Sequence, residues 1–597
     1  MTQELLMGNQ AIALGAIQAG VGVVTGYPGT PSSEILETVA KRNPGDIYVE
    51  WSVNEKSALE VAAGAAYAGI RTMVTMKQVG LNVASDPIMS LSYIGIKGGM
   101  VVVVADDPGP ISSQTEQDTR QFGIFSKIPV FDPSSPMEAY EMIHDAFDYS
   151  EKYHTPVIFR PTTRVCHANE SIPLKENRRD SKAEGFVKDS KWVIFPRLSY
   201  QRHKEIEDRD PVVSEDFSSY PLNVVTGTGK KGIAAGGVSY AYTREALSLL
   251  NGSCRLMKTA TPYPFPEKLA LEFLNGLDEV LVIEELSPYI EKELIYLCGK
   301  YGLSVKIRGK LTKDMPSAGE NTVSAVTNAI GEFLQLPYEK QAPEECPLPL
   351  PVRPPVLCAG CPHRASFYAV KQAMKGKKCV FSGDIGCYTL GNAKPLDMVD
   401  TCLCMGAGIT IAQGLHRAEP DTVNFAFIGD STFFHTGIPG VINAVYNNTD
   451  IVLIVLDNST TAMTGNQPHP GTGRTMMGNL TEKISIPDIL TAIGVKHIER
   501  VNPLYLNSAE DAVTRAAEVK GVSAVIFEAP CIQITNPEAA CQINEEKCTN
   551  CKRCIKELGC PAIVPDNGYI TIDTALCNGC SLCVQVCPFH AIGGSAQ

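Results

Sequence analysis

Apolar runs that end in turn residues and are followed by helix-forming stretches recur along the chain, which is the pattern of α/β domains built on parallel sheets. The clearest example is residues 422–465, where "VNFAFI", a Gly-Asp-Ser turn, "IPGVINAVY" and "IVLIVL" predict a strand, a tight turn, a helix and a strand. Near the N-terminus, "IYVEW" predicts a strand and residues 53–69 predict a helix of small residues. Residues 230–250 begin a further α/β pattern. The predicted fold class is α/β with doubly wound domains.

Two stretches interrupt this pattern and indicate domain boundaries. Residues 176–229 are charged and irregular and predict an extended, solvated connection, whereas 336–355 is rich in proline and predicts a linker. A chain of 597 residues is too long for one hydrophobic core. The predicted domains are therefore residues 1–175, 230–335, 356–535 and 541–597.

Composition and charge exclude several classes of protein. The chain is 44% hydrophobic and 20% charged, as is usual for a globular protein. A net charge of -13 argues against a nucleic-acid partner, which generally requires a basic face. The longest apolar runs, such as "MVVVVA" at 100–105, are too short to cross a bilayer, and the N-terminus lacks the basic region of a signal peptide. We expect a cytoplasmic protein with neither a membrane nor a nucleic-acid partner.

The cysteines change this picture, because eight of the twenty lie between residues 548 and 587. They form two runs of C-x2-C-x2-C, each followed by a fourth cysteine and a proline. A zinc site would use only pairs of cysteines, whereas three thiolates at this spacing bind three corners of a [4Fe-4S] cluster, and the fourth cysteine binds the other cluster. The first predicted cluster takes Cys548, Cys551, Cys554 and Cys587, and the second takes Cys560, Cys577, Cys580 and Cys583. The five residues "IKELG" before Cys560 lengthen one loop without removing a ligand.

Oxygen ligands for a hard cation are predicted upstream of these cysteines. Asp430 and Asn458 close the two strands predicted within 422–465 and are 28 residues apart. In a parallel sheet both lie at the carboxyl edge, where open α/β folds bind ligands. A carboxylate, an amide oxygen and the main-chain carbonyl of Thr460 form part of an octahedral Mg2+ site, which diphosphate oxygens and water would complete.

The spacing of these residues resembles the thiamine-diphosphate signature, in which Gly-Asp-Gly is followed by Asn at a strand end. Here Ser431 replaces the second glycine, and Asp457-Asn458 stands for the usual Asn pair. The resemblance implies that Gly429, Asp430, Ser431, Asn458 and Thr460 hold thiamine diphosphate and Mg2+. A thiamine site also needs a glutamate from a second domain to contact the aminopyrimidine. We predict Glu55 for that role, although a carboxylate at a helix N-terminus is also stabilising by itself.

A thiamine site and ferredoxin-type clusters in one chain resemble the 2-oxoacid:ferredoxin oxidoreductase family. "TGYPGTPSSE" (25–34) resembles the family loop whose threonine meets the substrate carboxylate, which implies Thr30 for the substrate and Gly29 beside the cofactor. "DDPGPISSQTEQDTRQFG" (106–123) resembles the loop whose arginine faces the 2-oxoacid, which implies Arg120. "CAGCPHR" (358–364) and "GDIGC" (383–387) resemble the start of the family's diphosphate domain.

Relatives of the pyruvate type hold a further cluster beside the thiamine with four cysteines of the diphosphate domain. Corresponding positions here imply a third, proximal [4Fe-4S] cluster on Cys358, Cys361, Cys387 and Cys531. The alternative is that these four residues are buried structural thiols, because free cysteine often packs as a small apolar residue.

The domain order and length resemble the α subunits of indolepyruvate ferredoxin oxidoreductases, with a middle domain of the transketolase C-terminal type and a two-cluster ferredoxin-like domain at the end. The resemblance implies oxidative decarboxylation of an arylpyruvate with CoA, and transfer of two electrons to ferredoxin. It also implies a smaller β subunit in a heterodimer or a dimer of heterodimers. A related enzyme for pyruvate or 2-oxoglutarate is the main alternative, and the eight clustered cysteines disfavour a non-redox decarboxylase.

Overall fold

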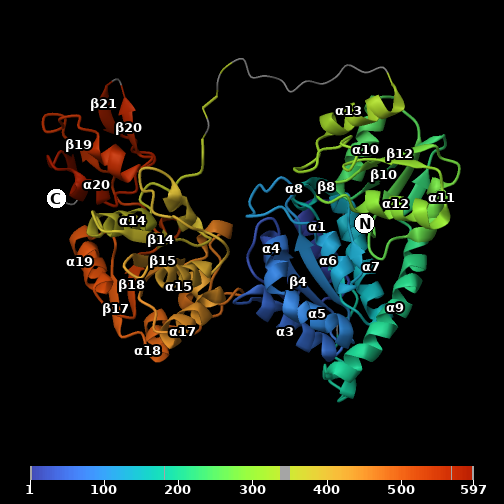
Figure 1. Ribbon diagram of the computed structural model, residues 1–597, viewed down its shortest axis with the longest axis horizontal. Helices are drawn as coiled ribbons and strands as arrows, with labels where there is room; N and C mark the ends of the chain where they lie inside the picture. The colour runs from blue at the N-terminus through green and yellow to red at the C-terminus, as the bar shows by residue number, and fades with distance from the viewer. Residues whose placement is uncertain are drawn as a thin grey trace. The chain divides into compact units, whose positions relative to one another are not determined.

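The computed structural model describes residues 3–180, 182–336, 348, 350–351, 353–566 and 568–594. The chain forms two compact units, Met1–Glu345 and Cys346–Gln597, which are described separately (Figure 1). Most of the predicted proline-rich linker at 336–355 lies outside the described residues. Both units are built on parallel sheets covered by helices, so the α/β fold class is confirmed.

The first domain of unit 1 is a six-stranded parallel sheet of order β3-β2-β4-β5-β7-β6. Its strands are β2 (Val23–Gly26), β3 (Tyr48–Trp51), β4 (Thr72–Lys77), β5 (Met100–Ala105), β6 (Val130–Phe131) and β7 (Val157–Phe159). The surrounding helices are α1 (Gly8–Gln18), α2 (Ser33–Lys41), α3 (Glu55–Tyr67), α4 (Gln78–Val83), α5 (Ser85–Ile94), α6 (Thr119–Ser126), α7 (Pro136–Tyr153) and α8 (Thr163–His167). All of β5 is buried, as expected for a strand covered by helices on both faces. An antiparallel ribbon of β1 (Gln3–Met7) and β8 (Asn169–Pro173) lies beside this sheet.

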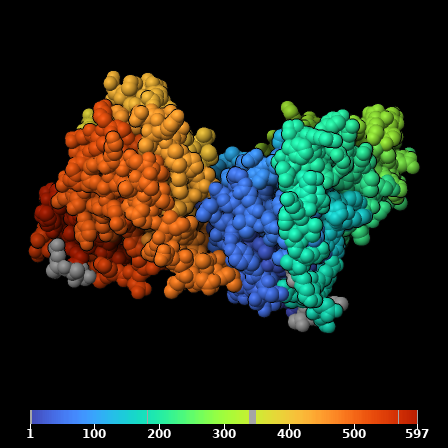
Figure 2. Space-filling view, turned by 90° about the horizontal axis from the view of Figure 1, so that it is seen from below, coloured from blue at the N-terminus to red at the C-terminus, as the bar shows by residue number. Residues whose placement is uncertain are grey.

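The charged stretch predicted to be an extended connection contains a long helix, α9 (Pro196–Ser218), so that prediction was wrong. The helix buries Ile206, Val213 and Phe217, which are seven and four residues apart and therefore share one face. Charged residues fill the positions between them, which hid the apolar stripe in the sequence. Figure 2 shows this helix in blue-green on the outside of unit 1.

The second domain of unit 1 is a five-stranded sheet of order β13-β12-β10-β11-β9, in which only β9 is antiparallel to its neighbour. The strands are β9 (Val224–Thr226), β10 (Lys231–Gly236), β11 (Arg255–Thr259), β12 (Glu279–Ile283) and β13 (Lys306–Arg308). The helices are α10 (Val238–Leu249), α11 (Glu267–Leu274), α12 (Tyr289–Tyr301) and α13 (Val323–Leu334). The α/β pattern predicted from residue 230 is therefore present, with one edge strand that begins earlier.

Unit 2 opens with a five-stranded, fully parallel sheet of order β14-β15-β16-β18-β17. Its strands are β14 (Cys379–Ser382), β15 (Val423–Gly429), β16 (Ile451–Asp457), β17 (His497–Val501) and β18 (Val522–Glu528). Its helices are α14 (Pro362–Ala373), α15 (Ala407–Ala418), α16 (Asp430–Thr432), α17 (Ile438–Tyr446), α18 (Ile486–Ile493) and α19 (Leu506–Ala517), with a π-helical turn over Phe433–Gly437. The strand, turn, helix and strand predicted within 422–465 are confirmed. Because β15 and β16 are neighbours, the residues that follow them lie at one sheet edge.

The C-terminal domain also belongs to unit 2. It packs on the domain with the parallel sheet, and the two domains share one hydrophobic core. It contains two antiparallel pairs, β19 (Gln542–Ile543) with β22 (Ile592–Gly593) and β20 (Ile563–Asp566) with β21 (Tyr569–Ile572), and a short helix α20 (Leu582–Val586). Leu558, Leu582 and Val586 belong to one buried cluster with Phe367 of α14 and Leu506 of α19. The inserted "IKELG" segment is ordered as a π-helical turn, Cys554–Leu558.

Among the described residues, no helix combines the length and the apolar character that a bilayer-spanning segment needs.

Candidate functional site

The structure brings Asp430 and Asn458 together at the carboxyl ends of β15 and β16 in unit 2. Both side chains are buried, as are Ser431 and Thr460. Asp430 Oδ1 accepts the Ser431 N–H at 2.8 Å, and Asn458 Oδ1 accepts the Thr460 N–H at 3.3 Å. The hydroxyl of Thr461 donates to Ser431 Oγ at 2.9 Å, which ties the two strand ends together.

Asp430 faces a second carboxylate, Asp457, and a histidine, His469. Burial alone would raise the pKa of Asp430, but its hydrogen bond to His469 Nε2, at 3.1 Å, and the Ser431 N–H hold that pKa below the usual range. Burial and the neighbouring Asp430 charge raise the pKa of Asp457 to about 6. A buried carboxylate next to a partly buried one therefore gives this edge an excess of negative charge that a divalent cation would neutralise.

His363, in the first turn of α14, reaches the same strand ends. Its Nε2 lies 3.3 Å from Asn458 Nδ2, and burial lowers the pKa of this histidine to about 4, so the ring is neutral. Tyr388 closes the floor beneath Gly429: a Cβ at that position would lie 2.6 Å from the tyrosine ring. Only glycine fits at residue 429, because any side chain would overlap the Tyr388 ring.

These groups fit the metal and diphosphate predicted from the sequence. Carboxylate, amide and main-chain oxygens are the donors that Mg2+ prefers, and diphosphate binds where main-chain N–H groups are accessible at a strand-to-helix turn. Asp430, Asn458 and the Thr460 carbonyl would hold the ion. His469 was not predicted, because no local motif marks it, whereas Asp457 and His363 lie in motifs that the sequence shows but were given no role.

In unit 1, Glu55 is the first residue of α3 and follows β3, as predicted. The side chain is 5% exposed and packs on Gly80, where a Cβ would lie 2.5 Å from Glu55 Oε1. Lys77, the last residue of β4, lies close enough to interact electrostatically with Glu55 and Asp107. Burial lowers the pKa of Lys77, and these two carboxylates act in the opposite direction.

The predicted substrate loop lies at the same edge of this sheet, because β2, β3 and β4 are parallel neighbours. Gly29 packs on the Lys77 stem, and a Cβ at residue 29 would lie 2.9 Å from Lys77 Cδ. The Thr30 carbonyl accepts from Ser112 Oγ at 3.2 Å, and Lys77 Nζ donates to the Ser112 carbonyl at 2.9 Å. One edge of the six-stranded sheet in unit 1 therefore brings together Gly29, Thr30, Glu55 and Lys77.

Arg120 does not join this group. The residue is 1% exposed, and its guanidinium forms ion pairs with Asp118 and Glu284, both at 2.8 Å. It also donates to the main-chain carbonyls of Glu285 and Ser287, so it ties α6 to the second domain of unit 1. The prediction that Arg120 faces the 2-oxoacid disagrees with this packing, because a guanidinium so committed to carboxylates and carbonyls is not available to a substrate.

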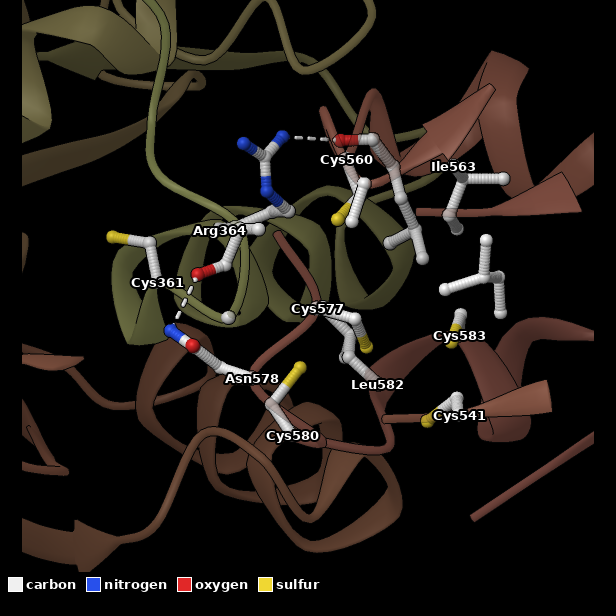
Figure 3. Close-up of a pocket in the computed structure, with 15 residues that line it drawn as sticks. Cys361, Arg364, Cys541, Cys560, Ile563, Cys577, Asn578, Cys580, Leu582 and Cys583 are labelled. Carbon is white, nitrogen blue, oxygen red and sulfur yellow. Dashed lines mark hydrogen bonds between the residues drawn. The ribbon is translucent and has the colours of Figure 1, made fainter. Parts of the chain in front are cut away.

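The cysteines of the second predicted cluster line one cavity, which we call the Cys577 cavity (Figure 3). Six cysteines line it: the four predicted ligands Cys560, Cys577, Cys580 and Cys583, then Cys541, which was not predicted, and Cys361, which was predicted for the proximal cluster. The cavity walls also include residues of the "CAGCPHR" segment. Asn578 Nδ2 donates to the Ala359 carbonyl at 3.1 Å, so the loop that carries Cys577 and Cys580 is docked on that segment.

The cysteines of the first predicted cluster line a separate cavity, which we call the Cys548 cavity. Cys548, Cys551, Cys554 and Cys587 all contribute, and every other lining residue belongs to the C-terminal domain. Each cavity thus draws three thiols from one C-x2-C-x2-C run and the fourth from the other, which is the arrangement of two-cluster ferredoxins. Across the described residues, no three His, Cys, Asp or Glu side chains are arranged for a single metal ion.

Cys541 is buried inside the Cys577 cavity, and its hydrogen bond to Cys583 lowers the pKa of Cys541 to about 6. Because four other thiols, those of Cys560, Cys577, Cys580 and Cys583, already match the ligand pattern, we expect Cys541→Ser to retain the iron content of the wild type. Cys583→Ser should lose about four iron atoms per chain. Iron and acid-labile sulfide analysis of anaerobically purified protein measures both, and equal losses in the two variants would contradict this ligand assignment.

The four cysteines of the hypothetical proximal cluster lie between the two sites of unit 2. The Cys531 N–H donates to the Asn458 carbonyl at 2.9 Å. Burial raises the pKa of Cys387 to about 11, with a contribution from Cys531 and Cys358, so these three thiols are neighbours. Cys361 lies close enough to Cys358 for an electrostatic interaction, and Figure 3 shows the Cys361 sulfur turned away from Cys577 and Cys580. Cys402 and Cys404 are exposed.

Three family models match the chain. They are "Pyruvate flavodoxin/ferredoxin oxidoreductase, thiamine diP-bdg" over residues 14–203, "Thiamine pyrophosphate enzyme, C-terminal TPP binding domain" over 384–527, and "4Fe-4S binding domain" over 570–593. With the fold and the buried site above, they define the class of protein: a thiamine-diphosphate-dependent 2-oxoacid:ferredoxin oxidoreductase that carries a ferredoxin-like 4Fe-4S domain.

Curated relatives narrow this class. The indolepyruvate oxidoreductase subunit IorA of Methanothermobacter marburgensis is 42% identical over 98% of this chain and 96% of its own length. The subunit IorA of Pyrococcus horikoshii is 41% identical, with the same coverage. The 2-oxoglutarate synthase subunit KorA of Archaeoglobus fulgidus is 26% identical over 50% of this chain and 92% of its own length. The chain belongs to the family of indolepyruvate oxidoreductase IorA subunits.

Proposed function

We propose that this chain is the catalytic subunit of an enzyme that oxidises arylpyruvates, with indolepyruvate as the preferred substrate. The reaction converts arylpyruvate, CoA and two oxidised ferredoxins into aryl-acetyl-CoA, CO2, two reduced ferredoxins and one proton. The observation that carries this proposal is that a domain with two cysteine-lined cavities packs onto the domain that holds Asp430 and Asn458. A decarboxylase without redox output would have no use for those thiols.

Thiamine diphosphate, when bound, accepts the electron pair released as CO2 leaves the 2-oxoacid. The residues of this chain would bind and orient that cofactor and form the hydrogen bond that its aminopyrimidine ring needs. Asp430, Asn458 and the Thr460 carbonyl would hold Mg2+ against the diphosphate, and Gly429 lets the main chain approach it. Glu55 would accept a hydrogen bond from the aminopyrimidine N1′ proton and so favour the tautomer whose nitrogen can remove a proton.

Lys77 supplies the cation for the substrate carboxylate in this proposal, in the role that the sequence suggested for Arg120. Its stem packs on Gly29, it interacts with Glu55, and its amine reaches the Ser112 carbonyl beside the Thr30 loop. Arg120, in contrast, is occupied by Asp118 and Glu284. The Thr30 hydroxyl would donate to the same carboxylate.

We expect Lys77→Met to raise the KM for the 2-oxoacid by about tenfold or more, because the carboxylate loses a charge-assisted partner in a partly buried site. Turnover at saturation should fall less than KM rises. Steady-state kinetics of Lys77→Met and Lys77→Arg, with the exposed Lys41→Met as a control, measure this. A KM for Lys77→Met equal to that of wild type would contradict the assignment.

Three [4Fe-4S] clusters follow from this proposal: one in each cavity of the C-terminal domain, and a proximal one on Cys358, Cys361, Cys387 and Cys531. The contact of Cys531 with Asn458 supports the third, since it places a candidate ligand beside the proposed cofactor site. Iron analysis distinguishes the cases, with about twelve atoms per chain expected for three clusters and about eight for two. Eight would restrict the clusters to the C-terminal domain.

We also propose that the chain works with a smaller β subunit, in a heterodimer or a dimer of heterodimers, and passes electrons to a ferredoxin. Co-expression with the β subunit and measurement of ferredoxin reduction by different 2-oxoacids test substrate and partners together. A kcat/KM at least about tenfold higher for indolepyruvate than for pyruvate or 2-oxoglutarate is expected. A preference for 2-oxoglutarate, the substrate named for the KorA relative, would overturn the aryl assignment but leave the 2-oxoacid chemistry intact.

A further inference from the structure

Arg364 is a buried cation that the sites described so far leave unexplained. Its side chain belongs to the first turn of α14 and is 4% exposed. It donates to the main-chain carbonyls of Leu357, Leu558 and Gly559, the last two at 2.6 and 2.9 Å. These contacts orient the guanidinium but leave its positive charge uncompensated.

Within the described part of the chain, Arg364 forms no ion pair with an acidic side chain, and its Nε has no hydrogen-bond partner. Burial lowers the pKa of Arg364, and the neighbouring groups that oppose this effect most strongly are the thiols of Cys560, Cys361, Cys580 and Cys358. A buried charge without a counter-ion is unstable, so this position calls for an anion.

The location of Arg364 indicates which anion. It lines the Cys577 cavity, and the two carbonyls that it binds immediately precede Cys560. Figure 3 shows the side chain between Cys361 and Cys560. A [4Fe-4S] core with four thiolates carries a net charge of −2 when oxidised and −3 when reduced by one electron, so a fixed cation stabilises the reduced state more.

We propose that Arg364 is the counter-charge of the second cluster, held by Cys560, Cys577, Cys580 and Cys583, and raises its reduction potential. This inference rests on the proposed function, because it requires a cluster in the Cys577 cavity. It goes further by assigning a positioning and electrostatic role to a residue that binds no iron.

His363, the residue before Arg364 in the sequence, connects this role to electron transfer from the thiamine site. His363 contacts Asn458 at the proposed diphosphate site, whereas Arg364 faces the Cys577 cavity. One helical turn therefore borders both sites. The Cys548 cavity is lined only by residues of the C-terminal domain. Of the two clusters in that domain, the second therefore lies nearer the proposed thiamine site, and Arg364 would raise its reduction potential there.

An EPR-monitored redox titration of the anaerobic complex tests the proposal. The signal of the second cluster is the one that Cys583→Ser removes. Arg364→Gln should lower its reduced-to-oxidised ratio at a fixed potential by at least tenfold, equivalent to about 59 mV for one electron. Arg364→Lys, which keeps the charge, should stay within about threefold of wild type.

Arg553→Gln is the matched control, because Arg553 lines the Cys548 cavity but its side chain is 46% exposed and paired with Glu557. It should leave both signals within about threefold of wild type. An Arg364→Gln protein with full iron content and an unchanged potential would overturn the proposal, since a purely structural role predicts that result.

If Arg364→Gln does not fold, Asn578→Asp tests the same charge from the facing loop, where Asn578 contacts the Ala359 carbonyl. The added negative charge should lower the potential of the second cluster by a similar tenfold ratio, and an unchanged potential would overturn the proposal. Wild-type protein without iron would instead overturn the proposed function, so the two failures are distinguishable.

Discussion

Glu55→Gln should reduce 2-oxoacid oxidation by about 10³-fold while leaving the iron content and the bound thiamine unchanged. The amide has nearly the shape of the carboxylate but cannot favour the required tautomer of the aminopyrimidine. Glu55 is 5% exposed and packed on Gly80, so the substituted side chain has no alternative position.

The matched control for this prediction is Glu60→Gln on the same helix. Glu60 is exposed and pairs with Lys56, so its removal should leave activity close to that of wild type. Activity is measured as ferredoxin or viologen reduction under anaerobic conditions, with thiamine and iron counted in each sample. Turnover of Glu55→Gln within about tenfold of wild type would remove Glu55 from the catalytic machinery.

Asp430→Asn should abolish activity by a different route, through loss of the cofactor itself. Asp430 is 3% exposed and is the carboxylate that would hold the metal ion in this proposal. Loss of a supporting contact to a metal ligand already costs about 10- to 100-fold in affinity, and loss of the ligand costs at least as much. We expect thiamine diphosphate to bind at least about 100-fold more weakly, with Mg2+ equally affected.

Calorimetric titration of thiamine diphosphate in the presence of Mg2+ measures this change. The control is Asp421→Asn, because Asp421 is exposed at the opposite end of β15. The iron content of Asp430→Asn should equal that of wild type, since the cluster cavities use none of its atoms. Unchanged cofactor affinity would contradict the metal assignment.

Features set by spacing along the chain were predictable from the sequence. The two cysteine runs sort into the same two groups of four in the structure as in the ferredoxin pattern. Asp430 and Asn458 meet because each closes a strand of one parallel sheet, and strand ends are readable from apolar runs. Glu55 begins the helix after β3 for the same reason.

Features that depend on three-dimensional contacts were not predictable. Arg120 resembles a substrate-binding arginine in its loop, but Glu284, 164 residues away, turns it into a link between domains. The helix α9 has its apolar stripe hidden among charges. Lys77, His469 and Cys541 reach their sites from segments without a local motif, so only the fold assembles them.

The most direct test of the account is whether the enzyme reduces its own clusters when it receives a 2-oxoacid. Anaerobic wild-type complex, loaded with thiamine diphosphate and Mg2+, is mixed with indolepyruvate in the absence of ferredoxin, and the clusters are followed by EPR. We expect signals of reduced [4Fe-4S] clusters that are absent in Glu55→Gln, and a weaker signal of the second cluster in Arg364→Gln. Release of CO2 without cluster reduction would contradict it, because the thiamine site and the thiols of this chain would then not be one electron-transfer system.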